Sequence, residues 1–380
     1  MRKRYDVAVI GAGPIGSYTA YQLADKGFSV CMFDAKKEIG KDVICAGVIS
    51  KRAFIRYDLP TDSILSRIDH FSFISPFGQR LEYEPPDVFA YVVSRSVFDK
   101  TILHMAQRVG VDVFMGHRVT KISESSGRYT LACEKAMCSV KSVIIATGVD
   151  YELHQTLKLS TPPRFLSGSQ IELPVKRDAS LIEIHLGQTF APASFGWVIP
   201  AGKRASRIGV ITLEKGTKWL EIMLKKRLHI PDAKRAKGAH VKIKPIAYGP
   251  AAKSVYGRII TVGEAAGQVK TTTGGGIFYG LLCSEIAVEK VAKNLKTKSS
   301  LNDYELTWRS TLISELDIGL RMREIGTQLS DQKIEDLFTF VKKHRFWVEM
   351  LVPRINFDFH SSLLYFCLKS FGALLRFPVA

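Results

Sequence analysis

The stretch Asp6-Val-Ala-Val-Ile-Gly-Ala-Gly-Pro-Ile-Gly16 decides the fold of this 380-residue chain. Its first half is an apolar, β-branched run, which is typical of a parallel strand with both faces buried. Its glycines have the spacing Gly-x-Gly-x-x-Gly, and a helix-like stretch follows from Ser17 to Lys26. Gly27 ends that stretch, and a second apolar run over residues 28–33 leads to Asp34. The sequence therefore predicts a βαβ unit and an α/β fold with a doubly wound, Rossmann-like sheet.

Each glycine of this motif has a physical task. Gly11 allows the tight turn after the strand, Gly13 lets the backbone approach a pyrophosphate, and Gly16 lets helix and strand pack closely. The helix N-terminus offers free N–H groups to the phosphates, and Ile15 lies in its first turn. Asp34 follows where a carboxylate accepts hydrogen bonds from ribose hydroxyls, which argues against a 2′-phosphate and hence against NADP in this site. We predict a dinucleotide with a free ribose.

A second glycine motif distinguishes FAD from NAD. Residues 258–262 read as a strand that leads into Gly263-Glu264, and Gly274-Gly275-Gly276-Ile277 then opens a long helix through Ala292. In two-domain flavoproteins such a returning segment holds the ribityl chain and points a helix dipole at the flavin pyrimidine edge. An NAD dehydrogenase that binds no flavin does not need this returning segment. The predicted cofactor is therefore FAD, contacted by Gly263, Glu264, Gly275, Gly276 and Ile277.

The segments between the two motifs follow a different pattern. Residues 69–93 and 165–213 read as short antiparallel strands with turn residues between them. We predict a discontinuous FAD-binding domain (1–68, 94–150 and 251–300), an inserted antiparallel-sheet substrate or cap domain (69–93 and 151–250) and a helical C-terminal region (301–380). Further elements are predicted as helices over 97–109 and 217–229 and strands over 111–115, 128–134 and 139–146.

The composition limits the class of partner and the compartment. Lys and Arg number 54 against 36 Asp and Glu, and the formal charge of +18 favours an anionic partner such as a membrane surface, a nucleic acid or a phosphorylated ligand. A generally basic proteome would explain the charge equally well. The six cysteines have no disulfide or zinc-ligand spacing, which predicts reduced thiols in the cytoplasm. No apolar run approaches the roughly 20 residues of a spanning helix.

Several motifs resemble those of the geranylgeranyl reductase family, which shares its fold with aromatic-ring hydroxylases, glutathione reductase-type enzymes and flavin halogenases. The resemblance covers about residues 5–295. It is carried by residues 6–16 with Asp34, by Glu38-Ile-Gly40 with Cys45 and Ser50, by Arg95-Ser-Val-Phe-Asp99 and by Pro192-Ala-Ser-Phe-Gly-Trp-Val-Ile-Pro200.

This resemblance implies further site residues. It places Cys45, Ala46 and Val48 in a loop beside the flavin, directs Arg95 to the cofactor, and gives Val119 a backbone contact with the adenine. Gly148 is included among the implied cofactor contacts, because Ala146-Thr-Gly148 stands where the family has Ala-Asp-Gly. Phe195 and Trp197 would line the cavity above the flavin, and with Cys45 they form the implied catalytic set. Ordinary core packing is the alternative for all three, since free cysteine is commonly a small buried hydrophobe.

The C-terminal end combines apolar and basic residues. Residues 360–377 place a broad apolar face on one helix, and Lys342, Lys343, His344 and Arg345 precede it. This pattern indicates peripheral contact with a membrane, at its inner face for a cytoplasmic protein, although a helix that packs on another domain is an alternative. No aromatic-interleaved basic stripe indicates nucleic acid.

The resemblance implies an FAD-dependent oxidoreductase that reduces carbon–carbon double bonds of a polyprenyl lipid by flavin hydride transfer. The electron donor, NAD(P)H or ferredoxin, is left open, and no residue stands out as the proton donor. One alternative is a flavin monooxygenase or halogenase acting on a soluble aromatic compound. Another is a membrane-associated flavin and isoprenoid carrier without catalysis.

Overall fold

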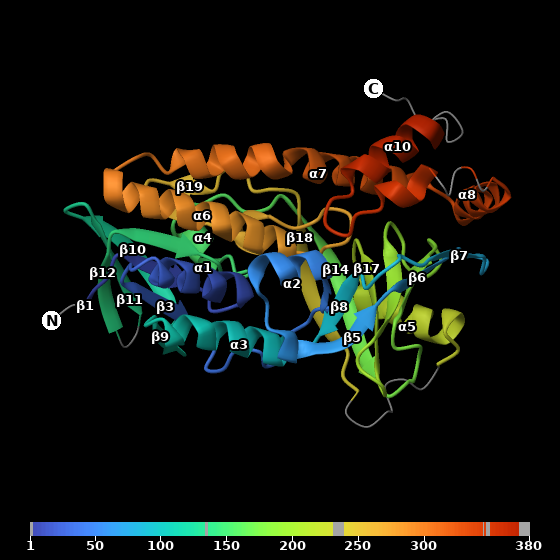
Figure 1. The fold of residues 1–380 in the computed structure, drawn as a ribbon, viewed down its shortest axis with the longest axis horizontal. Helices are drawn as coiled ribbons and strands as arrows, with labels where there is room; N and C mark the ends of the chain where they lie inside the picture. Colours follow the sequence, from blue (N-terminus) through green and yellow to red (C-terminus); the bar gives the residue numbers. More distant parts are fainter. Residues whose placement is uncertain (1–2, 134–135, 231–238, 345, 347–349, 372–380) are drawn as a thin grey trace.

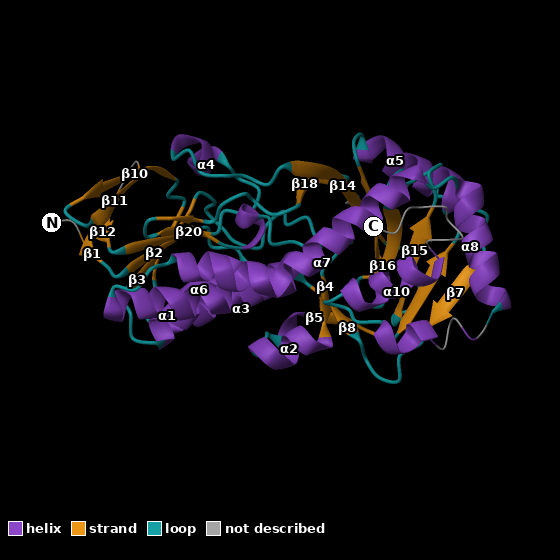
Figure 2. Cartoon of the chain, turned by 90° about the horizontal axis from the view of Figure 1, so that it is seen from above, coloured by secondary structure: helices purple, strands orange, loops and turns teal. Residues whose placement is uncertain are grey.

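The computed structural model describes residues 3–133, 136–230, 239–344, 346 and 350–371 (Figure 1). The molecule is elongated, with a six-stranded sheet toward one end and a seven-stranded sheet toward the other. Long C-terminal helices run along one side of both (Figures 1 and 2).

The six-stranded sheet contains the predicted βαβ unit. Its first strand, β2 (Val7–Ile10), is buried at all four residues and pairs in parallel with strands on both sides. The predicted α/β fold with a doubly wound sheet is confirmed. The strands lie in the order β19 (Val255–Tyr256), β20 (Ile259–Thr261), β13 (Ser142–Ile145), β2, β3 (Val30–Asp34) and β9 (Asp112–Met115).

Different layers cover the two faces of this sheet. Val7 and Val9 face a core with helices α1 (Pro14–Asp25), α3 (Arg95–Arg108) and α6 (Ile277–Thr297). Ala8 and Ile10 face the other way, as the period of two along a strand requires, and pack against a four-stranded sheet. The strands of that sheet lie in the order β1 (Lys3–Arg4), β12 (Ala136–Val140), β11 (Arg128–Cys133) and β10 (Val119–Ser125).

The single strand predicted over residues 139–146 is wrong. Strand β12 ends at Val140 in the small sheet, and β13 begins at Ser142 in the six-stranded sheet. The backbone N–H groups of Lys141 and Ser142 both donate to the Asp6 carbonyl, at 3.0 and 3.1 Å. The chain therefore crosses between two layers at Lys141, which the strand-like pattern of residues 139–146 does not reveal.

The seven-stranded sheet is mostly antiparallel, as predicted for most of the inserted segments. One face packs on α5 (Gly216–Ile222), which continues as a π-helical turn over Met223–Arg227. An apolar cluster that includes Trp197 and Ile199 covers the opposite face. The strands lie in the order β18 (Lys242–Tyr248), β14 (Arg164–Leu173), β17 (Ser206–Thr212), β16 (Phe195–Pro200), β15 (Leu181–Leu186), β6 (His70–Ile74) and β7 (Arg80–Tyr83).

A small sheet and a short helix lie between the two large sheets, and of their elements only the strand over residues 90–93 falls in a segment predicted as antiparallel strands. Ser50 caps this helix, since its hydroxyl accepts a hydrogen bond from the Ala53 N–H group at 3.0 Å. Elements this short contain too few residues for a hydrophobic period that distinguishes a helix from a strand. They are β4 (Val48–Ser50), α2 (Lys51–Tyr57), β5 (Ile64–Ile68) and β8 (Ala90–Val93), with a 3₁₀ turn at Thr61–Ser63.

The C-terminal region is helical, as predicted for the part that the structure describes. Buried Tyr304 and Trp308 of its first helix pack into the core beside α6, while Arg323 further along contacts the seven-stranded-sheet side. Among the described residues no helix is both long and apolar enough to cross a membrane. The helices are α7 (Asn302–Gln328), α8 (Asp331–Lys343) and α10 (Ser361–Phe371), with short turns α4 (Glu152–Thr156) and η5 (Val352–Arg354) elsewhere.

Candidate cofactor and substrate site

The three glycines of the first motif occupy different surroundings. A Cβ atom at Gly11 would lie 2.4 Å from the Ala146 carbonyl oxygen, and one at Gly16 would lie 1.9 Å from the Gly11 carbonyl oxygen. Gly11 also has a φ of 103°, which side chains disfavour. At Gly13 a Cβ atom would meet no atom of the described chain within 4 Å. Gly11 and Gly16 are therefore required by packing, and Gly13 leaves open space in front of a helix.

The helix behind that space is suited to an anion. Gly13 is the N-cap of α1, no side chain caps the helix, and its first turn holds no acidic residue. Uncapped N–H groups at a helix N-terminus attract phosphate. Asp34, at the end of β3, accepts hydrogen bonds from the N–H groups of Ala12 at 2.7 Å and Lys36 at 2.8 Å. These bonds hold its carboxylate beside the glycine turn, where the sequence predicts the ribose.

Val119, in the four-stranded sheet, lies near the end of β3 that carries Asp34. It begins β10 and is buried, and the nearby His117 N–H donates to the Asp34 carbonyl at 2.8 Å. The structure thus brings Val119 close to Asp34 along the backbone.

The two glycine motifs meet at one side chain. A Cβ atom at Gly263 would lie 3.3 Å from Cγ2 of Ile15, and one at Gly280 would lie 2.6 Å from its Cδ1. The hydroxyls of Thr19 and Ser284 lie 2.7 Å apart and join α1 to α6. Segments about 250 residues apart in sequence therefore adjoin, and their joint binding of one cofactor stays a prediction.

Glu264 is placed beside this junction. Its Oε2 accepts a hydrogen bond from Nζ of Lys244 at 2.6 Å, and a Cβ atom at Gly148 would lie 4.0 Å from the same oxygen. Helix α6 begins nearby with Gly276 as its N-cap, again without a capping side chain or an acidic residue in the first turn. Gly275 and Ile277 flank that cap, so a second helix N-terminus is open to an anionic or electron-rich group.

Cys45 lies beside Arg95. Arg95 binds Asp99 through two hydrogen bonds, Nε to Oδ1 at 2.8 Å and Nη2 to Oδ2 at 3.0 Å. Burial by itself raises the pKa of the Cys45 thiol, but the positive charge of Arg95 and the Gly47 N–H group outweigh burial and lower that pKa from its ordinary value. The Arg95 guanidinium is thus committed to Asp99 and Cys45, and its direct contact with the cofactor stays a prediction.

Arg207 holds the loop after Cys45, and this role was not predicted from the sequence. Its Nη1 donates to the carbonyls of Ala46 at 2.9 Å and Val93 at 3.0 Å. A Cβ atom at Gly47, whose φ is 78°, would lie 2.4 Å from the same nitrogen. An arginine inside the apolar strand over residues 206–212 is the signal that could have revealed it.

Phe195 and Trp197 lie in the apolar cluster on the seven-stranded sheet. Ala46 and Val48 pack against the same cluster, so the loop near Cys45 and the predicted cavity wall adjoin. Gly209 gives the indole room, because a Cβ atom there would lie 2.2 Å from Trp197 Cζ2. The buried Trp197 Nε1–H has no hydrogen-bond partner among the described residues. A buried donor of this kind is costly unless a ligand or water accepts from it.

A buried polar cluster supports the loop that precedes α6. Lys270 Nζ donates to the Phe357 carbonyl at 2.5 Å and to Asp358 Oδ1 at 3.1 Å. Arg323 donates to the carbonyls of Thr271 at 3.0 Å and Thr272 at 2.7 Å. Burial lowers the pKa of Lys270. The sequence gives no signal for this cluster, because its members are far apart along the chain.

His360 completes the cluster. Its Nδ1 lies 2.7 Å from the Thr272 hydroxyl. Burial, together with the charge of Lys270, lowers the pKa of His360 to about 4, so its imidazole is neutral near pH 7. The C-terminal segment is therefore bonded directly to the loop of the second glycine motif.

Comparisons with known proteins identify the class of enzyme. A family model described as pyridine nucleotide-disulphide oxidoreductase matches residues 5–160. Digeranylgeranylglycerophospholipid reductase 1 of Methanococcoides burtonii is 29% identical, covering 90% of this chain and 88% of that protein. The corresponding reductase of Methanocaldococcus jannaschii is 28% identical, covering 88% and 89%. The chain is an FAD-dependent oxidoreductase. The resemblance to the geranylgeranyl reductases predicted from the sequence is confirmed.

Solved structures show how widely the fold of this oxidoreductase is shared. A geranylgeranyl bacteriochlorophyll reductase-like protein from Thermoplasma acidophilum superposes with a TM-score of 0.86 at 19% identity, covering 99% of this chain and 98% of that one. The p-nitrophenol 4-monooxygenase of Pseudomonas putida superposes with a TM-score of 0.72 at 15% identity, covering 96% and 99%. Fold alone therefore does not separate reduction from oxygenation.

Proposed function

We propose that this oxidoreductase reduces carbon–carbon double bonds of a geranylgeranyl lipid. The single observation that carries the proposal is the apolar wall formed by Phe195, Trp197 and Val48 beside the Cys45 loop. A wall of this kind suits a hydrocarbon chain, and its cluster adjoins the second glycine motif, since a Cβ atom at Gly274 would lie 3.0 Å from Ile246 of the same cluster. Similarity along about 90% of the chain to proteins named digeranylgeranylglycerophospholipid reductases supports the same substrate class.

We assign the predicted residues to parts of FAD. Gly13 and the α1 N-terminus would receive the pyrophosphate, and Asp34 the ribose. The α6 N-terminus would face the flavin, and reduced FAD, when bound there, supplies a hydride. The remaining cofactor contacts are assigned to Gly11, Ile15, Gly16, Cys45, Ala46, Val48, Arg95, Val119, Gly148, Gly263, Glu264, Gly275, Gly276 and Ile277.

The chain's own residues would orient the lipid and exclude water. Phe195 and Trp197 hold the alkene against the cofactor, and their apolar surface keeps water and oxygen away. Cys45, whose thiol has a lowered pKa beside Arg95, places a polarisable group at the edge of this space.

A prenyl-reduction assay tests the proposed function. Dithionite-reduced protein should convert a geranylgeranyl lipid to products heavier by about 2 mass units per saturated bond, as hydride plus proton requires. Dithionite makes the result independent of the natural donor, NAD(P)H or ferredoxin. Trp197→Ala should slow this step on the order of 100-fold per bound FAD, because a misplacement of about 1 Å costs that much.

Trp219→Ala is the matched control, because Trp219 belongs to α5 and packs against the opposite face of the same sheet. Trp197→Phe keeps the core filled if the alanine variant folds poorly. Equal rates for Trp197→Ala and wild type would place Trp197 in the structural core only. Oxygen-dependent hydroxylation or halogenation with inert prenyl lipids would support the monooxygenase or halogenase alternative. Bound lipid without any turnover would support the carrier.

We further propose that the C-terminal region contacts a membrane surface. Phe346, Val352 and Tyr365 are 64%, 41% and 47% exposed, and Lys342 and Lys343 end the amphipathic helix α8. Apolar side chains beside basic ones favour an anionic interface. Part of the predicted membrane segment, residues 345, 347–349 and 372–377, lies outside the described residues.

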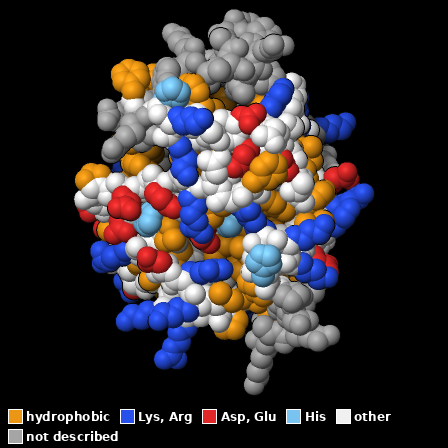
Figure 3. All heavy atoms as spheres, turned by 90° about the vertical axis from the view of Figure 1, so that its right-hand side faces the viewer, with side chains coloured by type: hydrophobic (Ala, Val, Ile, Leu, Met, Phe, Trp, Pro, Cys, Tyr) orange, Lys and Arg blue, Asp and Glu red, His pale blue; other side chains and the backbone are white. Residues whose placement is uncertain are grey.

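On the face of the molecule in Figure 3, basic side chains are interspersed with acidic and apolar ones rather than gathered in a stripe, so no nucleic-acid partner is proposed.

Sedimentation with anionic vesicles tests the membrane contact. The double variant Phe346→Ser and Val352→Ser should bind at least about 100-fold more weakly, since each fully inserted apolar side chain contributes roughly 1.5–3 kcal/mol. Added salt should weaken wild-type binding, because charges are screened beyond about 10 Å at 0.1 M. Leu306→Ser, which alters a side chain that is 68% exposed on α7, is the control. Unchanged sedimentation of the double variant contradicts the proposal.

A further inference from the structure

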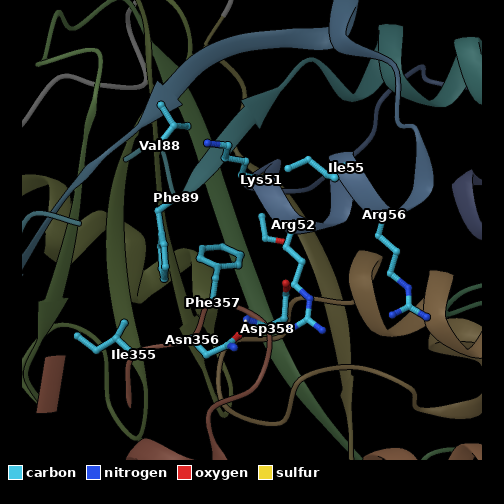
Figure 4. A pocket seen from close by; sticks show the side chains of 11 residues that line it. Lys51, Arg52, Ile55, Arg56, Val88, Phe89, Ile355, Asn356, Phe357 and Asp358 are labelled. Atoms are coloured by element: carbon cyan, nitrogen blue, oxygen red, sulfur yellow. Dashed lines mark hydrogen bonds between the residues drawn. The ribbon is translucent and has the colours of Figure 1, made fainter. Parts of the chain in front are cut away.

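A pocket of about 540 Å³ opens between α2 and the segment that leads into α10 (Figure 4). It is separate from the predicted cofactor contacts. Basic side chains of α2 form one side, and apolar side chains form the other, so the pocket has a charged rim and an apolar wall (Figure 4). The charged and aromatic side chains of this lining are Lys51, Arg52, Arg56, Phe89, Phe357 and Asp358.

The charges of the rim do not cancel. Arg56 binds Glu285 at 2.7 Å, Lys51 binds Asp87, and the Asp358 carboxylate is bonded to a buried lysine at 3.1 Å. Arg52 lies over the aromatic rings of Phe278 and Phe359, at 5.7 and 5.3 Å from their centroids. Within the part of the chain that the structure describes, Arg52 forms no ion pair with a carboxylate. The pocket therefore carries one uncompensated guanidinium.

The apolar wall continues toward the predicted substrate cavity. The rings of Phe89 and Phe357 pack edge to face with centroids 5.8 Å apart. Both belong to the layer packed on the apolar cluster of Trp197. Lys270, at the start of the loop before α6, lies 4.7 Å from the centre of the Phe357 ring. One layer of aromatic side chains thus connects the basic rim with the cavity wall.

We propose that this pocket binds the phosphate headgroup of an anionic prenyl lipid, with Arg52 as its principal ligand. A guanidinium donates two parallel hydrogen bonds to a phosphate, which a solvated lysine does not match. Lys51 reaches the same anion once it leaves its exposed partner Asp87. The prenyl chain then lies along Phe89 and Phe357 toward Trp197. This assignment rests on the proposed function and adds to it the part of the substrate that fixes its orientation.

The test compares two geranylgeranyl lipids with the same chains, one with a phosphate headgroup and one neutral. For each protein the ratio of kcat/KM for the phosphorylated lipid to that for the neutral one is measured, together with the Kd of each lipid. Wild type should prefer the phosphorylated lipid, and Arg52→Gln should lower this ratio about tenfold or more, since a hydrogen bond to a charged group contributes roughly 1.5–3 kcal/mol. Arg52→Lys keeps the charge and should keep part of the preference.

Arg67→Gln is the matched control. Like Arg52, Arg67 is exposed and lies over an aromatic side chain, with its guanidinium 5.8 Å from the centre of the Tyr91 ring. It does not line the pocket. Its ratio should equal that of wild type. FAD content and thermal unfolding of each variant show whether Arg52→Gln folds normally.

Each outcome separates the headgroup site from the proposed function. An unchanged ratio and unchanged Kd in Arg52→Gln would overturn the headgroup site while prenyl reduction stands. If wild type reduces neither lipid, prenyl reduction fails, and the Kd values alone decide the headgroup site. Arg52-dependent binding of inorganic phosphate without any lipid preference would identify a free phosphate site and overturn the lipid assignment.

Discussion

Gly13→Ala should yield a folded protein that has lost nearly all of its FAD. Gly13 has ordinary backbone angles, φ −64° and ψ 175°, and a Cβ atom there meets nothing of the described chain within 4 Å. The fold therefore accepts alanine. The added methyl group occupies the space through which a pyrophosphate reaches the α1 N-terminus. Loss of two hydrogen bonds to charged oxygens, at roughly 1.5–3 kcal/mol each, corresponds to FAD binding weaker by at least about 100-fold.

Two further alanine substitutions separate this effect from a general loss of packing. Gly16→Ala should lose both stability and FAD, because its Cβ atom would lie 1.9 Å from the Gly11 carbonyl oxygen. Gly326→Ala, in α7, meets no atom within 4 Å and should change neither property. The measurements are flavin absorbance per mole of protein and the thermal unfolding midpoint. A Gly13→Ala protein that holds FAD like wild type would remove the pyrophosphate from this position.

The parts of the site that could be predicted from the sequence are those built from neighbouring residues. Gly11, Gly13, Gly16 and Asp34 lie within one βαβ unit, whose geometry follows from local spacing. Alternation along the strand around Trp197 likewise predicts a one-sided wall, because side chains in a strand alternate between faces. In both cases the period of the sequence carries the information.

The parts that could not be predicted depend on contacts between distant segments. Arg207 reaches the Ala46 carbonyl, 161 residues away, and Lys270 reaches Asp358, 88 residues away. Each lies in a stretch whose local pattern indicates only a strand or a loop. The break at Lys141 belongs to the same class, since it depends on the carbonyl of Asp6, which lies between β1 and β2 far away in the sequence. Tertiary packing, rather than propensity, decides these positions.

Removal of one partner from the buried Lys270–Asp358 pair should cost a large share of the stability. The two side chains are 6% and 1% exposed. Lys270→Met removes one charge and leaves the other buried without its partner, which costs about 3–5 kcal/mol. Chemical denaturation should report this loss. Lys225→Met, which breaks a pair 2.9 Å long between side chains 51% and 42% exposed, should change stability by about 1 kcal/mol or less.

The double variant Lys270→Met and Asp358→Asn distinguishes the cost of an uncompensated charge from the loss of a hydrogen bond. It removes the uncompensated carboxylate, and replacement of a whole buried pair is often close to neutral, so most of the loss should be recovered. Equal instability of the single and double variants would mean that Lys270 contributes through its hydrogen bond to the Phe357 carbonyl instead. The backbone of Lys270 also holds the glycine loop, since its carbonyl accepts from Gly274 N–H at 2.8 Å. FAD content should therefore fall with stability in the single variant and return in the double one, which would show that the C-terminal segment supports the cofactor loop through this ion pair.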